Sequence, residues 1–98
     1  MTKKELQNYT GYIWGLRYFM GPVPSKYLGV TVDFEGKTYA IVAEYDVKVI
    51  ALEIDDCELT EIAAVRRCLN NAFFKDKLND FQKEVLSNRL ALLEAKEQ

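Results

Sequence analysis

The chain has 98 residues, of which 13 are basic, 15 are acidic and none is histidine, so its formal net charge at pH 7 is -2. A chain of this length buries about 60 to 68 per cent of its unfolded surface, which is enough for one domain over residues 1–98 without a metal or a disulfide. The charge balance excludes a general attraction to nucleic acid or anionic membranes, and no stretch approaches the roughly 20 apolar residues of a membrane span.

The start of the chain is polar. Glu5, Gln7 and Asn8 follow Lys3 and Lys4, so the apolar run of a secretory signal peptide is missing from this segment. We therefore expect a cytoplasmic location.

The first predicted element is a helix over residues 3–20. Thr2 and Glu5 form a capping box, which starts a helix at the following residue, and a glycine and a proline end it. Apolar residues at steps of three and four predict the buried face of this helix: Leu6, Tyr9, Ile13, Leu16 and Met20. Residues 21–25, GPVPS, are then expected to form an extended spacer.

A second face of the predicted helix carries Trp14 and Tyr18 beside Gly11 and Gly15, which leave no side chains between them. Each interior glycine costs about 1 kcal/mol of helix propensity relative to alanine, so this pair predicts that something approaches the backbone closely. Trp and Tyr are enriched in protein interfaces, and these four residues are therefore the first candidate partner-binding site. The alternative is that Trp14 covers the edge of the protein's own core.

Three antiparallel strands are predicted over residues 27–34, 38–45 and 47–54. Apolar side chains alternate with polar ones along the first of them, and Gly36 supplies the positive φ that a tight hairpin needs. The third strand is apolar on much of both faces. Because a parallel crossover needs a dozen or more residues, the short connections predict an antiparallel meander.

A helix over residues 56–74 is predicted to follow the sheet, with Asp55 and Glu58 as its capping box. It would hold the two cysteines, Cys57 and Cys68, at a spacing of roughly 16 Å along the helix, which excludes a disulfide between them. We expect both thiols to be free and buried.

The last predicted element is a helix over residues 77–96, capped by Asp76 or Asn79. One apolar stripe holds Leu78, Phe81, Val85 and Leu92. A second stripe lies about a quarter-turn or more away and makes the apolar arc too wide for one contact. We assign the second stripe to a partner-binding surface, with contact to both the sheet and the preceding helix as the alternative: Leu86, Leu90 and Leu93.

Five carboxylates crowd the junction between the sheet and the helix after it: Glu53, Asp55, Asp56, Glu58 and Glu61. They lack the long loop and the glycine with which an EF-hand wraps a cation, so we expect no metal. Acidic residues in a first helical turn are favoured by the helix macrodipole, which gives them a structural role. The second interpretation is an acidic docking patch for a basic partner.

The groups that usually carry catalysis are scarce. Without histidine, Cys57 and Cys68 lack the usual activating base, and Ser25 and Ser87 stand in no recognisable nucleophile motif. Zinc lacks a plausible ligand set, and no glycine loop for phosphate is present in the sequence. We therefore expect no enzymatic activity and no cofactor.

The predicted fold is α+β: an N-terminal helix, a three-stranded antiparallel meander and two C-terminal helices (αβββαα). Over residues 2–74 this order is similar to that of double-stranded RNA-binding domains at the level of topology. Such domains place lysines at the start of the helix after the sheet, where this chain has Asp55, Asp56 and Glu58. The resemblance therefore implies a shared architecture without a shared function.

The function that these features favour is a small interaction module that binds or occludes a partner protein as a regulator or inhibitor, in the manner of phage inhibitors of host systems. The expected partner is another protein, further copies of the chain in a dimer or higher oligomer, or both. One alternative is a domain that binds a small ligand, a nucleotide or nucleic acid with Tyr27, Tyr39 and Tyr45. The other is an acidic mimic of nucleic acid.

Overall fold

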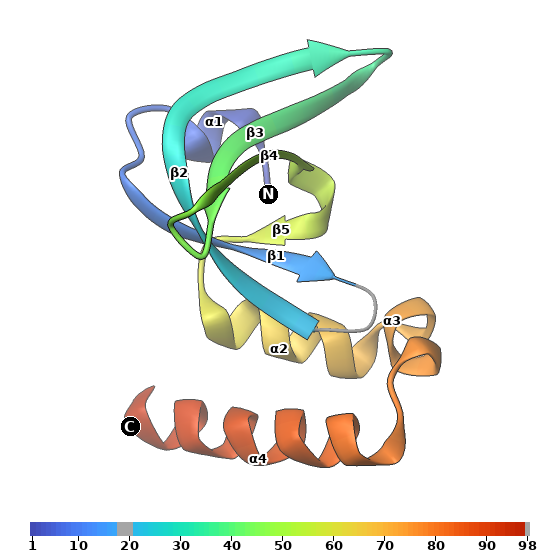
Figure 1. Ribbon diagram of the computed structural model, residues 1–98. Helices are drawn as coiled ribbons and strands as arrows, with labels where there is room; N and C mark the ends of the chain where they lie inside the picture. The colour runs from blue at the N-terminus through green and yellow to red at the C-terminus, as the bar shows by residue number, and fades with distance from the viewer. Residues whose placement is uncertain (18–20, 98) are drawn as a thin grey trace.

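The computed structural model describes residues 1–17 and 21–97. In this part of the chain a five-stranded antiparallel sheet is followed by most of the helices, which confirms the predicted α+β class (Figure 1). The strands are β1 (Gly11–Arg17), β2 (Gly21–Phe34), β3 (Lys37–Glu44), β4 (Lys48–Glu53) and β5 (Cys57–Glu58), in the spatial order β4-β3-β2-β1-β5. The helices are α1 (Lys3–Leu6), the 3₁₀ helix η1 (Ile54–Asp56), α2 (Glu61–Asn70), α3 (Ala72–Lys77) and α4 (Asp80–Glu97).

The predicted meander is confirmed, because β2, β3 and β4 pair in sequence order and antiparallel. Glu35 and Gly36 form the tight turn between β2 and β3 with φ angles of 51° and 79°. The predicted spacer over residues 21–25 is wrong, since β2 already starts at Gly21 and pairs there with β1. Its two prolines are tolerated because the β3 pairing of β2 begins only at Ser25, so this part of the strand has β1 alone as a neighbour.

The predicted helix over residues 3–20 is wrong beyond its first turn. The Thr2–Glu5 capping box is present, with Glu5 N donating to Thr2 Oγ1 at 3.2 Å and Thr2 N donating to Glu5 Oε1 at 2.8 Å. The helix ends at Leu6, and β1 replaces it from Gly11 onward; the rest of the prediction, residues 18–20, lies outside the described residues. The order of elements shared with double-stranded RNA-binding domains is lost with this helix.

Both faces of β1 are covered, and this explains the error. Ile13 is fully buried on the face that meets β3 and β4, while Trp14 and Leu16 point to the opposite face and pack against α2. A strand that is buried on both sides is apolar at successive positions, and such a run also contains the steps of three and four of a helix. The glycines, aromatic residues and isoleucine of this segment favour a strand over a helix.

The protein has two clusters of buried apolar side chains, one on each face of β1. The inner core lies on the concave side of the sheet, where α1 and η1 close it: Leu6, Ile13, Tyr27, Ala40, Val42, Leu52, Ile54 and Cys57. The outer core joins β1 to α2 through Leu16, Ala64 and Cys68, with Trp14 and Leu86 partly buried against them. Figure 1 shows α2 beneath β1 and the start of β2, and α4 beneath α2.

The boundaries of the later helices differ from the prediction. The helix predicted over residues 56–74 begins only at Glu61, because Thr60 is the N-cap and its hydroxyl accepts from Ala63 N at 3.2 Å. Residues 54–58 instead form η1 and β5, and α3 spans the boundary between the two predicted helices. Helix α4 runs over 80–97 in place of 77–96, and of its two predicted caps the structure selects Asn79, whose Oδ1 accepts from Gln82 N at 2.8 Å.

A double-mutant cycle tests the close packing of β1 against β4. A Cβ atom at Gly15 would lie 2.8 Å from Leu52 Cδ1, so Gly15→Ala should lower the free energy of unfolding by about 1–3 kcal/mol, the usual cost of overpacking. In a Leu52→Ala background the same substitution should cost less, because the opposing atoms are gone. Urea unfolding of the four proteins measures both costs, and equal costs in the two backgrounds would contradict the contact.

Candidate functional site

The first predicted partner-binding residues are spread over β1. Trp14 is half-buried against the outer core, and Gly11 starts the strand with a φ of 124°. Gly15 is buried, and the close approach expected there comes from Leu52 of the same chain. Tyr18 lies outside the described residues. The structure therefore places Trp14 and Gly15 within the packing of the protein itself.

The two apolar stripes of α4 lie in different surroundings. Leu86 packs against the outer core, and Leu90 and Leu93, one and two turns further on, are half-buried. In the other stripe Leu78 is buried, whereas the remaining three residues face solvent: Phe81 (73% exposed), Val85 and Leu92. A bidentate contact fixes this orientation of the helix, since Arg89 Nε and Nη2 donate to the two carboxylate oxygens of Glu61 on α2 at 2.5 and 2.7 Å.

Cations accompany most of the five predicted acidic residues. Arg67 lies 3.2 Å from Glu58 and 4.0 Å from Asp56, and it donates to the backbone carbonyl of Asp55. Glu61 is held by Arg89, and Glu53 by Lys37 at 3.7 Å. This pairing weakens the negative field that an acidic docking patch or a nucleic-acid mimic would need.

A broad exposed apolar surface lies on the convex face of β2, β3 and β4. Among the described residues, 11 large hydrophobic side chains are exposed, and seven of them fall between Leu28 and Val49. The strand register places most of these on one face together with half-buried neighbours. We name this surface the outer sheet patch: Leu28, Val30, Val32, Phe34, Tyr39, Ile41, Val49 and Ala51.

An irregularity in β2 widens the outer sheet patch. The β2–β3 register shifts between Tyr27 and Thr31, where Gly29 adopts a φ of 86°. Because Tyr27 pairs with Val42 and Thr31 with Ala40, three residues of β2 stand opposite Ile41 alone. Leu28 and Val30 are both exposed there.

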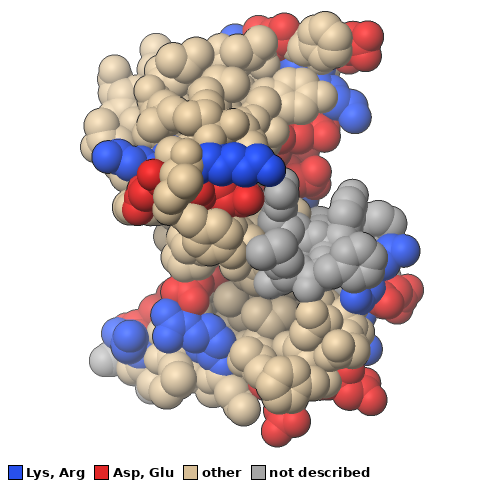
Figure 2. Space-filling model, viewed as in Figure 1, with Lys and Arg blue, Asp and Glu red and all other residues tan. Residues whose placement is uncertain are grey.

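The outer sheet patch is nearly neutral and stands on a hydrogen-bonded sheet. At one end Lys37 and Glu53 form an ion pair, and Lys26 lies at the other end of the same face. Figure 2 shows a broad area without Lys, Arg, Asp or Glu on the upper part of the molecule, where the sheet lies, with charged side chains at its margins. A hollow of about 260 Å³ lies on the patch itself, lined by Val32, Phe34, Tyr39, Ile41 and Ala51.

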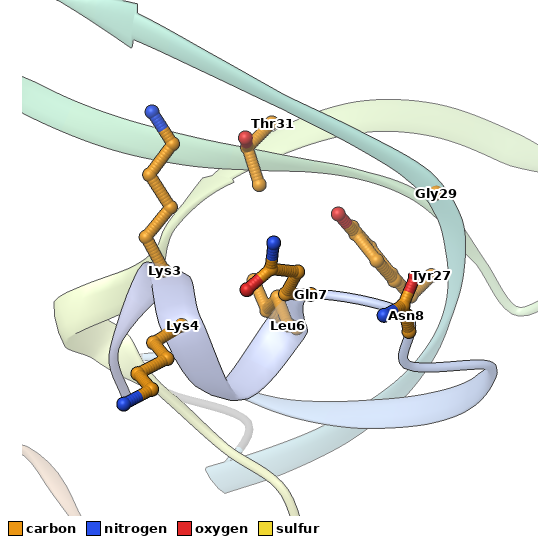
Figure 3. A pocket seen from close by; sticks show the side chains of 8 residues that line it. All are labelled: Lys3, Lys4, Leu6, Gln7, Asn8, Tyr27, Gly29 and Thr31. Carbon is orange, nitrogen blue, oxygen red and sulfur yellow. The ribbon is translucent and has the colours of Figure 1, made fainter.

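A second hollow, of about 520 Å³, opens between α1 and the irregular part of β2. Figure 3 shows Tyr27 and Gln7 directed into it and Lys4 directed away from it. Lys3 at its rim is paired with Asp33 at 2.9 Å. The three tyrosines proposed for ligand binding do not meet here, because Tyr39 belongs to the outer sheet patch and Tyr45 to the β3–β4 turn.

The sequence offered one signal for the outer sheet patch. The alternation of Leu28, Val30, Val32 and Phe34 with polar residues is typical of a strand with one buried face. In the structure these four side chains point outward, and Tyr27 and Thr31 lie on the inner side of the sheet. The alternation therefore shows that the four side chains share one face, but it does not show which face of the sheet is buried. The residues that decide the question belong to β1 and α2.

No three Cys, Asp or Glu side chains among the described residues converge closely enough to hold a metal ion. None of the described helices is long and apolar enough to cross a membrane.

Both cysteines are free and buried, as predicted, although Cys57 lies in β5 and not in a helix with Cys68. Burial raises the pKa of the Cys57 thiol to about 12 and that of Cys68 to about 11. Both thiols are therefore protonated at neutral pH and lack the thiolate form that a nucleophile needs.

These thiols make stability depend on pH in the alkaline range. An unfolded thiol ionises near pH 8.5, while the folded one keeps its proton up to pH 11 or 12, so the free energy of unfolding should fall as the pH rises above about 8.5. Urea unfolding across this range should show a smaller fall for Cys68→Ala than for the unaltered chain. At pH 8 a thiol reagent should label neither cysteine of the native protein and both in denaturant; rapid native labelling or parallel pH curves would contradict this account.

The comparisons with known proteins yield no relative. No protein-family model matches the chain, and neither a curated protein nor a solved structure gives a significant match. The function is therefore to be inferred from the surfaces that this fold leaves exposed.

Proposed function

We propose that the protein is a small, non-enzymatic protein-protein interaction module whose contact surface is the outer sheet patch. The observation that carries the proposal is that five of the 11 exposed large hydrophobic side chains among the described residues gather on one continuous sheet face, beside the half-buried Tyr39 and Ile41. Such a module acts as a regulator or an inhibitor by occupying a surface of its partner. Its free thiols suit a reducing compartment such as the cytoplasm.

The energetics of the outer sheet patch support this role. Removing apolar surface from water gains roughly 25 cal/mol per Å², and a large contiguous apolar patch usually marks an interaction site. The side chains of the patch stand on a hydrogen-bonded sheet, so little conformational entropy is lost when a partner binds. The stripe of Phe81, Val85 and Leu92 on α4 is narrower and has a polar residue, Asn88, within it.

Four residues with reactive side chains are held in structural contacts. Cys57 and Cys68 belong to the two cores, and the carboxylates of Glu58 and Glu61 are held by arginines. These engagements support binding over catalysis as the role of the protein.

Site-specific photo-cross-linking tests the proposal. A photoreactive phenylalanine analogue replaces Phe34 in the outer sheet patch, and the matched control carries it at Phe81, an equally aromatic and exposed position on α4. After irradiation in an extract of the cells that produce the protein, we expect a discrete protein adduct from position 34 and not from position 81. Mass spectrometry identifies the adduct.

Two results would contradict the proposal. Position 34 could give no protein adduct at any concentration of the module. Alternatively, both positions could give the same set of adducts, which would show general adhesion by exposed aromatic rings.

A further inference from the structure

We infer that the occupant of the outer sheet patch is a second copy of this chain, related to the first by a two-fold axis. This inference rests on the proposed function and names the partner.

The outer sheet patch has a projection and a hollow side by side. Phe34 stands at the end of β2 next to the turn and is 61% exposed. The hollow beside it has entirely apolar walls, which Phe34 itself lines together with Val32, Tyr39, Ile41 and Ala51. Two copies related by a two-fold axis can each place the projection in the other's hollow, since an isologous contact uses the same surface on both partners.

The charges at the outer sheet patch favour an equally neutral partner. Lys37 and Glu53 already neutralise each other, Lys26 lies apart from them at the other end of the face, and the chain as a whole carries only -2. A strongly acidic or basic partner would find almost no complementary charge on this face, whereas a second copy meets no strong repulsion. In a two-fold contact each lysine can also approach the glutamate of the other copy.

The exposed stripe of Phe81, Val85 and Leu92 on α4 does not suit the outer sheet patch as its occupant. Figure 1 shows α4 at the end of the molecule opposite to the β2–β3 hairpin. If α4 of one copy covered the patch of another in a head-to-tail contact, each molecule would still offer a patch or an α4 stripe to a further copy, and the assembly would grow into a ring or an open chain. A two-fold contact between patches closes at two copies.

Molar mass measured by light scattering over a dilution series of the purified chain tests the inference. The mass should rise from that of one 11.3 kDa chain toward twice that value with concentration. Phe34→Ser should weaken the dimer by about 30-fold, the effect typical of losing an aromatic anchor. Phe81→Ser, which removes an exposed phenylalanine from α4, should leave the dissociation constant unchanged. Thermal unfolding confirms that both variants are folded.

The position of the cross-link gives an independent readout. In the purified protein, the photoreactive group at position 34 should attach to the hollow of the second copy, at Val32, Tyr39, Ile41 or Ala51. An adduct mapped to α4 would overturn the two-fold arrangement. A dimer that Phe34→Ser leaves intact would overturn it as well.

The failure of this inference can be separated from that of the proposed function. If the chain stays monomeric up to millimolar concentration while position 34 cross-links a different protein in the extract, the second copy is excluded and the interaction module stands. If the chain is monomeric and position 34 gives no protein adduct, both fail.

Discussion

The structure depends on the burial of β1 from two sides. Ile13 reaches the inner core, Trp14 and Leu16 reach the outer core, and the strand between them is the wall that both cores share. Gly15 makes this possible on the inner side, because Leu52 occupies the space that any larger residue would need. A change in β1 therefore acts on the sheet and on the helices at once.

The same arrangement decides which surface stays bare. Helix α2 covers the outer side of β1 and the first part of β2, and α4 packs on α2, so the helices are stacked at one end of the sheet (Figure 1). Strand β2 extends beyond this end of the sheet. After Gly29 its residues pair with β3 and no longer with β1, and we call this part of the strand the arm. The convex face of that arm lies beyond the reach of the helices, and it is the outer sheet patch.

Sequence patterns predicted the elements whose signals are local. The Glu35–Gly36 turn, the Thr2 capping box and the burial of two free thiols depend on neighbouring residues or on residue type, and each is confirmed. The helix over residues 3–20 failed because burial from both sides hides the period of a strand. The predicted start of the next helix at residue 56 is wrong for a related reason: residues 57–58 form β5, which pairs with β1, and the sequence predicts a helix in place of β1.

The candidate site shows the same limit of prediction from sequence periodicity. Sequence periodicity identified both stripes of α4 but could not tell which one meets α2, and the alternation in β2 likewise left open which side of the sheet is covered. In both cases, the apolar side chains that stay exposed are the ones that no other described element of the chain covers. An exposed apolar sheet face invites aggregation unless something covers it. An ion pair between Lys37 and Glu53 lies at the edge of this face, and a hydrogen-bonded sheet lies beneath it. Both features suit a specific protein contact more than non-specific aggregation.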